Sequence, residues 1–478
     1  METIITQITV KVVEKILKNI EKNGIGEICQ TAESFLSILK EGALELLTAA
    51  VEEVDSAVLQ AKKERRNDGL TVKQKNVPRT VITSLGEFTY KRTYYKVDNG
   101  AMIYLTDHLI GVEPFERVSK ELCAELVQNT ASMSMEKAVK VTGAAVSRQT
   151  VNNKVLAMKD VVTKINKAKF TPRELHIFAD EDHVHLRPKR SAIVPIVTVT
   201  EGIDTSNDKR HKTISPVHFQ GYGMDIHCFV ENVVAAIYEK YDMDKVEKVF
   251  IHGDGGNWIN TLETLLPNAV FLMDGFHLKK YEKKLFNHKG AIPYIGVIRK
   301  AIKENKYESF AEYCSSISQK QDEAGRKKLE EIVGYFRNNW DSIVERMSGE
   351  HPGSCTEPIV SHVLSDRLSR NPLAWSKEGL GKMAMLRVFE VNGGKVRAEH
   401  IRISRSKKDR EKDHYALKNG LAIYNKYAEE QIKAAFGGKH DWSIFEKENA
   451  NSCIFSGKVT GTSVILKAYS HLNALKIS

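Results

Sequence analysis

The sequence predicts an α/β protein in which a helical N-terminal region precedes a mixed sheet. Apolar residues recur every three or four positions through residues 1–65, which is the period of an amphipathic helix. From residue 174 onward, short apolar segments rich in β-branched residues alternate with helical patterns. A chain of 478 residues is long enough for two or three domains, so both regions can have their own core.

Composition narrows the class of protein. The formal net charge of +10 favours polyanionic partners, which fits nucleic acid, although acidic membranes or simple solubility would also explain it. None of the six cysteines forms a CxxC pair, so a zinc ribbon or redox motif is unsupported. No apolar stretch approaches the roughly 20 residues of a membrane span, and the first residues read as an amphipathic helix. We expect a cytoplasmic, nucleoid-associated protein without a membrane partner.

The N-terminal helical region, residues 1–75, leads into a small antiparallel β element at residues 76–115. The segment "RTVITSLGEFTYKRTYYKV" is rich in β-branched and aromatic residues and turns at Leu85 and Gly86. Its basic residues alternate with tyrosines. Two interpretations remain open, a solvated sheet face and a surface that follows a nucleic-acid backbone.

Residues 116–170 predict a helix-turn-helix-like DNA-binding region. A first helix would end near Thr142, Gly143 would make the turn, and Ser147 would cap a second helix. Plain packing of two helices would give the same pattern. The second helix carries side chains that can donate to phosphates and base edges: Arg148, Gln149, Asn152, Asn153 and Lys154.

Residues 171–275 and 351–395 predict an RNase H-like catalytic core. The expected order is β-β-β-α-β-α-β, with three meandering strands followed by crossovers. A large helical insertion at residues 276–350 interrupts this core. A basic region, residues 396–478, ends the chain.

Carboxylates stand where such a core would need them. Phosphodiester chemistry on this fold uses two divalent ions, which bind oxygen ligands. Asp254 ends the fourth strand, and the glycines after it let a phosphate approach the backbone. On the first strand, alternation places Asp180 and Asp182 on one face and does not choose between them. The third carboxylate must lie beyond the last strand, at Glu357 or Glu378.

Each signal has an ordinary structural alternative. The segment "GDGGN" alone is typical of a helix N-cap, and a lone helical glutamate is typical of a solvated surface. The three carboxylates together, in fold order, favour a metal site.

Several motifs resemble those of one enzyme family. "DEDHV" (180–184), "GDG" (253–255) and "DGFH" (274–277) resemble the strand motifs of bacterial insertion-sequence transposases with a DDE site. The closer resemblance is to the ISLre type, related in architecture to Mutator-like transposases. It spans most of the chain, through the segments "LGEFTYKRTYY", "SRQTVNN", "HVLSDRLS" and "WSKEG".

This resemblance implies roles for individual residues. It selects Asp180 over Asp182, and it assigns Asp180, Asp254 and Glu357 as catalytic ligands of two Mg²⁺ or Mn²⁺ ions. Pro358 directly after Glu357 departs from the family pattern, but proline is acceptable at the first positions of a helix. Four further residues are placed near the active site: Asp182, Asp274, His277 and Glu378.

Two basic segments follow the strands. Nine basic residues against two acids at 279–306 predict a track for the DNA backbone. Acids dilute the second run, at 396–412, so DNA contact and a solvated face both remain open for it. The first track contains Lys279, Lys280, Lys283, Lys284, Lys289, Arg299, Lys300, Lys303 and Lys306.

The leading expectation is a DDE transposase that binds the terminal inverted repeats of its insertion sequence. It would cleave one DNA strand and join the freed 3′-hydroxyl to target DNA. Its partner is double-stranded DNA, and pairing two ends requires a homodimer or higher oligomer. The alternatives are an RNase H-like nuclease outside transposition and a non-catalytic DNA-binding protein.

Overall fold

The structure is a computed structural model that divides into two compact units, described separately below. One unit takes in 1–130, 134–159 and 396–478, and the other takes in 131–133 and 160–395. Within the part of the chain that is described, no helix has the length and apolar character to cross a membrane. The described residues are 2–24, 26–98, 100–188, 190–206, 212–348, 351, 354–370, 374–402, 422–423 and 425–426.

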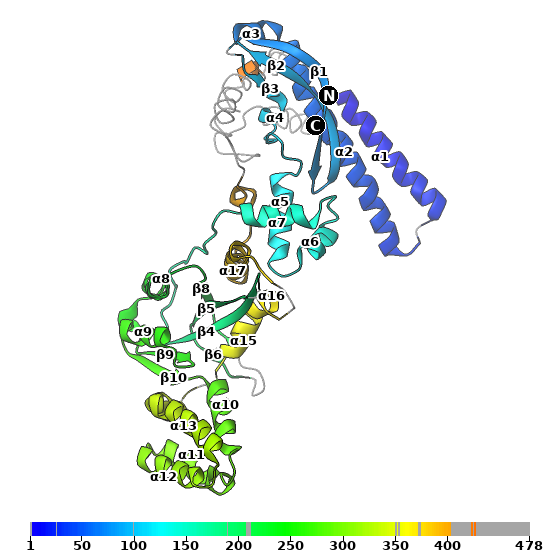
Figure 1. The fold of residues 1–478 in the computed structure, drawn as a ribbon. Helices are drawn as coiled ribbons and strands as arrows, with labels where there is room; N and C mark the ends of the chain where they lie inside the picture. The colour runs from blue at the N-terminus through cyan, green and yellow to red at the C-terminus, as the bar shows by residue number, and fades with distance from the viewer. Residues whose placement is uncertain are drawn as a thin grey trace. The chain divides into compact units, whose positions relative to one another are not determined.

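The first unit begins with the predicted helices, α1 (Glu2–Asn23), α2 (Ile28–Gln60) and the short α3 (Lys62–Asn67). α1 and α2 form an antiparallel hairpin (Figure 1), which ion pairs fix in register. Lys11 Nζ lies 2.7 Å from Glu45, and Lys15 Nζ lies 2.7 Å from Glu41.

The predicted β element is a three-stranded antiparallel sheet of β1 (Leu70–Thr83), β2 (Gly86–Val97) and β3 (Met102–Ile103). Tyr90 and Tyr95 are fully buried, and the buried Arg92 is ion-paired with Asp107. These three side chains therefore belong to the core, and the interpretation of them as a nucleic-acid surface is wrong. Lys91 and Lys96 remain exposed on the same strand.

A buried carboxylate fastens α2 to this sheet. Asp55 accepts hydrogen bonds from Thr93 N at 2.7 Å, from Thr93 Oγ1 at 2.6 Å and from Thr106 Oγ1. Thr106 lies on α4 (Leu105–Leu109), so one side chain joins three elements. A buried charge is tolerated when hydrogen bonds satisfy it in this way.

The helix-turn-helix boundaries are confirmed. Gly143 ends the first helix in the left-handed conformation at φ 64°, and Ser147 Oγ accepts from Thr150 N at 3.1 Å. Val151 and Val155 are buried, as their spacing predicts. The three helices here are α5 (Lys120–Thr130), α6 (Met135–Thr142) and α7 (Arg148–Ala157).

The second unit is built on a five-stranded mixed sheet in the order β10-β9-β4-β5-β8. β4, β5 and β8 form an antiparallel meander, whereas β9 and β10 run parallel to β4. The predicted chain order of three strands and two crossovers is confirmed. The strands are β4 (Glu174–Leu186), β5 (Arg190–Thr200), β8 (Val217–Gln220), β9 (Lys248–Gly253) and β10 (Ala269–Met273), with a small ribbon of β6 (Ile203–Asp204) and β7 (Lys212–Thr213).

Strand alternation on β4 separates the two faces of the sheet. Leu175, Ile177 and Ala179 pack in the core with α8 (Ile226–Lys240) and α9 (Asn257–Leu265). The side chains of Asp180 and Asp182 point to the opposite face. That face is covered by the helical segment from α15 (Thr356–Val360) through a π turn (Ser361–Ser365) to α16 (Asp366–Leu368), and α17 (Lys377–Val391) packs beside it on β8.

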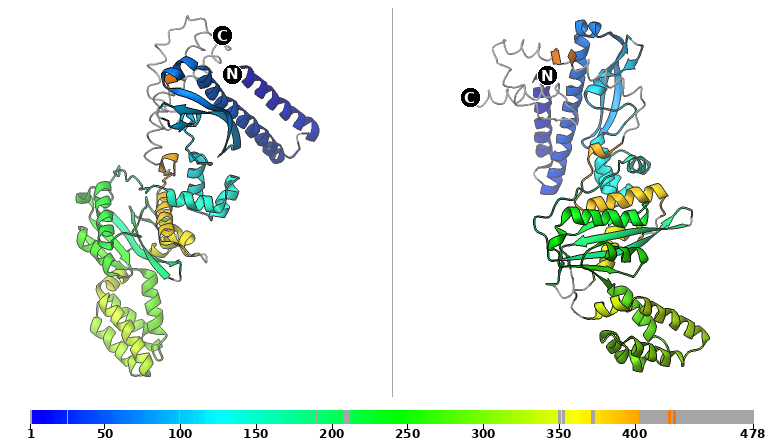
Figure 2. Two further views of the ribbon diagram at one scale, coloured as in Figure 1. Left: turned by 45° about the horizontal axis from the view of Figure 1, so that its top comes forward. Right: turned by 90° about the vertical axis from the view of Figure 1, so that its left-hand side faces the viewer.

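The insertion after β10 is helical, as predicted. Phe310, Phe336 and Trp340 form its aromatic centre, with ring centroids about 5 Å apart. Figure 2 shows these helices as a bundle next to the sheet. They are α10 (Gly275–Phe286), α11 (Ile295–Lys303), α12 (Tyr307–Ser318), α13 (Glu323–Asn338) and α14 (Trp340–Met347).

We predict that Asp55→Ala destabilises the first unit. The substitution leaves the Thr93 N–H and the Thr106 hydroxyl buried without an acceptor, which costs about 2–4 kcal/mol. Calorimetry of the full chain should show a lower melting temperature for one transition. Glu33→Ala, at an exposed carboxylate of the same helix, should melt like the wild type; equal melting of both variants would contradict the role of Asp55.

Candidate active site

Asp180 lies in the middle of β4 on the face shared with Asp182. Burial raises the pKa of Asp180 to about 6, and the charges of Asp254 and Asp274 raise it further. A hydrogen bond from Glu181 N at 2.8 Å and the nearby His277 work in the other direction. A carboxyl that is hard to ionise beside other carboxyls is typical of a functional site.

Asp254 follows β9 directly and is exposed. Its Oδ1 accepts from Gly256 N at 3.0 Å, which closes a tight turn. Neighbouring backbone is close, because a Cβ on Gly253 would lie 3.2 Å from the Ala179 carbonyl oxygen. The end of β9 therefore lies beside the middle of β4, next to Asp180.

The loop after Asp254 requires glycine for two reasons. Gly255 has φ 90°, in the left-handed region that side chains rarely adopt. A Cβ at this position would also clash with the Asn339 side chain, which reaches the loop from between α13 and α14. The helical insertion thus lies directly against the loop that carries Asp254.

Asp274 ends β10 and caps α10. Its Oδ2 accepts from Phe276 N at 2.9 Å and from His277 N at 3.2 Å, and its Oδ1 accepts from the Ser354 hydroxyl. Burial works to raise the pKa of Asp274, but hydrogen bonds from His277, Ser354 and Thr356 outweigh it and hold the pKa below its usual range. These donors therefore favour the charged form of Asp274.

His277 interacts electrostatically with carboxylates on or directly after three strands. Its Nδ1 lies 3.4 Å from Asp274 Oδ2, and this contact raises the pKa of His277. Burial opposes the increase, whereas the charges of Asp180 and Asp254 add to it. The structure therefore brings Asp180, Asp254, Asp274 and His277 into one electrostatic group.

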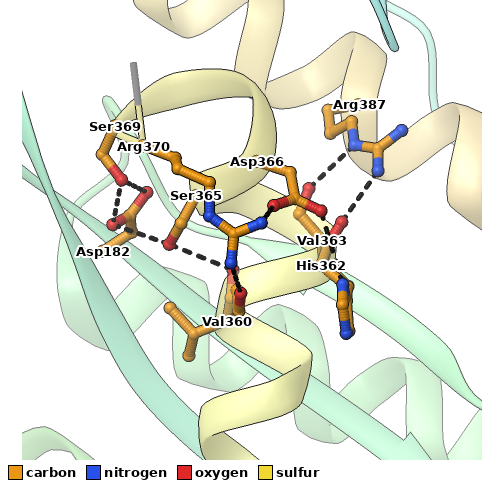
Figure 3. A network of polar contacts seen from close by, with 10 residues as sticks. Asp182, Val360, His362, Val363, Ser365, Asp366, Ser369, Arg370 and Arg387 are labelled. Atoms are coloured by element: carbon orange, nitrogen blue, oxygen red, sulfur yellow. Dashed lines mark hydrogen bonds and ion pairs between the residues drawn. The ribbon is translucent and has the colours of Figure 1, made fainter. Parts of the chain in front are cut away.

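Asp182 has a different environment from Asp180. It is buried, and its carboxylate accepts from Ser365 Oγ at 3.1 Å and from Ser369 Oγ at 2.9 Å (Figure 3). Burial raises its pKa, which these hydroxyl donors partly offset. Asp182 therefore fastens a helix to the strand, whereas Asp180 faces the other acids.

Glu357 and Glu378 are both exposed, in the first turns of α15 and α17. Across the described ranges, no three carboxylate, imidazole or thiol groups lie close enough together to hold a metal ion. Asp180 and Asp254 thus interact electrostatically, but within the described residues neither glutamate joins them in a three-ligand group.

Sequence reasoning missed the serines around the site. Ser354 links Asp274 to Thr356, with 2.9 Å between the two hydroxyl oxygens. Ser365 and Ser369 stand four residues apart, and this helical spacing was the available signal.

The nine basic residues of the track predicted at 279–306 are exposed. Three of the nine are paired with acids, Arg299 with Glu282 and both Lys300 and Lys306 with Glu304. The four lysines of α10, which begins at the site, are Lys279, Lys280, Lys283 and Lys284.

The second helix of the helix-turn-helix pair also presents donors. Arg148, Gln149 and Asn153 are exposed, and Gln149 Nε2 donates to Asn153 Oδ1 at 2.9 Å. Asn152 is half-buried. Lys154 is largely buried and lies 2.6 Å from Glu116, so its charge is already partnered. In the basic run at 396–412, residues 403–412 lie outside the described residues.

We predict that His277 titrates above the ordinary imidazole value, because carboxylates favour its charged form. The stability that this pair contributes is full below the ordinary imidazole pKa and lost as the pH rises through the folded value. NMR titration of ¹³C-labelled histidine, assigned with His277→Gln, measures it. Asp274→Asn should lower the pKa of His277, and an unchanged value would contradict the pairing.

Comparison with known proteins places the chain in a family. The model described as "Uncharacterised protein family (UPF0236)" matches residues 22–405. Three similar relatives come from Caldanaerobacter subterraneus subsp. tengcongensis, each 32% identical. One relative aligns over 96% of this chain and 95% of its own length, and its name carries eleven locus designations. UPF0236 protein TTE2489 aligns over 90% of each chain, and one named with four loci aligns over 94% and 93%. This chain belongs to the UPF0236 family.

Proposed function

We propose that the protein is a DDE transposase that cleaves and joins DNA at the ends of its own insertion sequence. The observation that carries the proposal is the group formed by Asp180, Asp254, Asp274 and His277 at the middle or carboxyl ends of three neighbouring strands. A meander followed by two parallel strands is the order of RNase H-like enzymes, which act on phosphodiesters. Asp180 and Asp254 stand on the first and fourth strands, where such enzymes keep their ligands.

The donor set suits hard divalent cations in part. Asp180 and Asp254 offer oxygen ligands, which Mg²⁺ and Mn²⁺ prefer, and their mutual repulsion would be relieved by a cation. Two such ions, when bound, would supply Lewis-acid stabilisation of the reacting phosphate. Glu357 completes the set only if its exposed side chain turns toward Asp180, and Glu378 is the reserve.

The remaining residues of the group have supporting roles in this proposal. His277, whose charged form Asp274 favours, would contact the scissile phosphate. The lysines of α10 begin two residues beyond His277, so DNA bound along them would lead to the site. Cleavage by water would free a 3′-hydroxyl, which would attack target DNA in the second step.

The relatives add independent support. One name covers eleven loci in a single genome and another covers four. Transposition produces such repeated copies, whereas a repair nuclease needs only one gene. Acting on two ends at once would require a homodimer or higher oligomer on double-stranded DNA, and the protein would then be found at the nucleoid.

The first test is strand cleavage and transfer on labelled DNA that carries the gene's own flanking ends, with Mg²⁺ or Mn²⁺. We expect end-specific nicking and joining by the wild type, and loss of both in Asp180→Asn and Asp254→Asn. Glu357→Gln should abolish the reaction if Glu357 is the third ligand, with Glu378→Gln as its matched control.

The outcomes separate the rival functions. Cleavage without end preference or joining would indicate an RNase H-like nuclease outside transposition. DNA binding without cleavage by any of these proteins would leave a non-catalytic DNA-binding protein and overturn the enzymatic proposal.

A separate prediction concerns the second helix of the helix-turn-helix pair. Arg148→Ala should weaken binding to the terminal repeats and reduce the salt dependence of the binding constant by about one unit of slope, since one phosphate contact is lost. Lys154→Ala is the matched comparison, and it should leave the slope unchanged because Glu116 already pairs that charge. Fluorescence anisotropy at several salt concentrations measures both; equal slopes in Arg148→Ala and wild type would exclude the contact.

A further inference from the structure

The helical segment that carries Glu357 contains an irregular turn. α15 ends at Val360, a π turn runs from Ser361 to Ser365, and α16 follows. A π turn inserts one extra residue, and each residue rotates a helix face by about 100°. The turn therefore decides the direction of Glu357 relative to the residues of α16.

The turn is held from the side of α17. A π turn leaves carbonyl groups outside the regular helical pattern, so other donors must satisfy them. Arg387 Nε donates to the Val363 carbonyl at 3.0 Å, and Nη2 donates to the His362 carbonyl at 2.7 Å. Glu390 fixes the same guanidinium through a contact of 2.7 Å.

The turn is held from the sheet by Asp182, as Figure 3 shows. One carboxylate accepts from the last residue of the turn, Ser365, and from Ser369 beyond it. Ser369 contacts both oxygens, at 2.9 and 3.1 Å. A carboxylate suits this position because both of its oxygens accept hydrogen bonds, whereas an amide of the same shape keeps only one acceptor oxygen.

The start of the segment is fastened independently. Ser354 Oγ donates to Asp274, and Thr356 N donates to Ser354 Oγ at 3.3 Å. Glu357 is the next residue. It therefore lies between the contact of Ser354 with Asp274, directly after β10, and the contact of the π turn with Asp182 on β4. The two strand carboxylates thus fix the segment at both ends.

We propose that Asp182 is a positioning residue for the DDE site. By holding the π turn together with Arg387, it sets the rotation of α15 and with it the position from which Glu357 would turn toward Asp180 and Asp254. This inference rests on the proposed function. Packing alone would not need it, because burying a carboxylate costs free energy that an apolar side chain would not.

The test compares Asp182→Ala and Asp182→Asn with Asp366→Asn, at a half-buried carboxylate of the same segment that pairs with Arg370. Strand cleavage is measured across Mg²⁺ and Mn²⁺ concentrations, together with DNA affinity and hydrogen exchange of residues 361–369. Asp182→Ala should lower the cleavage rate about 10- to 100-fold, raise the metal concentration for half-maximal rate, and speed exchange. DNA affinity should not change, Asp182→Asn should be intermediate, and Asp366→Asn should match the wild type.

Each contrary outcome is distinct. Wild-type metal dependence in Asp182→Ala, while the wild type cleaves, would overturn the positioning role alone. A rate loss that is equal at all metal concentrations and accompanied by lost DNA binding would also overturn it, because that indicates general unfolding.

If Asp182→Ala does not fold, the double substitution Ser365→Ala and Ser369→Ala tests the same contact from the other side. A wild type that never cleaves would instead overturn the proposed function, and this is seen before any variant is compared.

Discussion

Three carboxylates interact across neighbouring strands, one in the middle of β4 and two directly after β9 and β10, and the free-energy cost of holding them together constrains the second unit. Burial, with a smaller contribution from the neighbouring carboxylates, raises the pKa of Asp180, whereas several hydrogen-bond donors lower the pKa of Asp274. His277 supplies the nearest positive charge. The guanidinium of Arg346 adds to this compensation, since it lies against Gly275 and interacts favourably with Asp274.

The helical insertion and the late helices act as supports for these strand ends. Asn339 reaches the loop after Asp254, and the Ser354 hydroxyl reaches Asp274 from the far end of the insertion. On the other face of β4, Trp258 Nε1 donates to Glu181 at 2.7 Å and anchors α9 beside the same strand. Glu181 and Asp182 therefore each have their own hydrogen-bond partners. Asp180 is the acid of the "DED" motif (180–182) that faces the other carboxylates.

Much of the second unit could be predicted because its signals are local. Strands and helices begin where the period of apolar residues changes, and in the first unit the predicted cap Ser147 lies at the start of α7. Partnerships between distant segments could not be predicted in this way. Arg92 and Lys154 look like available cations in the sequence, yet acids 15 and 38 positions away in the chain pair with them.

The sequence by itself determined the order of the strands and the placement of Asp180, Asp254 and Asp274 within or directly after them. It could not distinguish Asp180 from Asp182, because alternation gives both the same face. The tertiary structure decided this, by setting Ser365 and Ser369 over one carboxylate and the charges of β9 and β10 beside the other. The physical reason is that the environment of a buried charge is built from residues that meet only when the chain has folded.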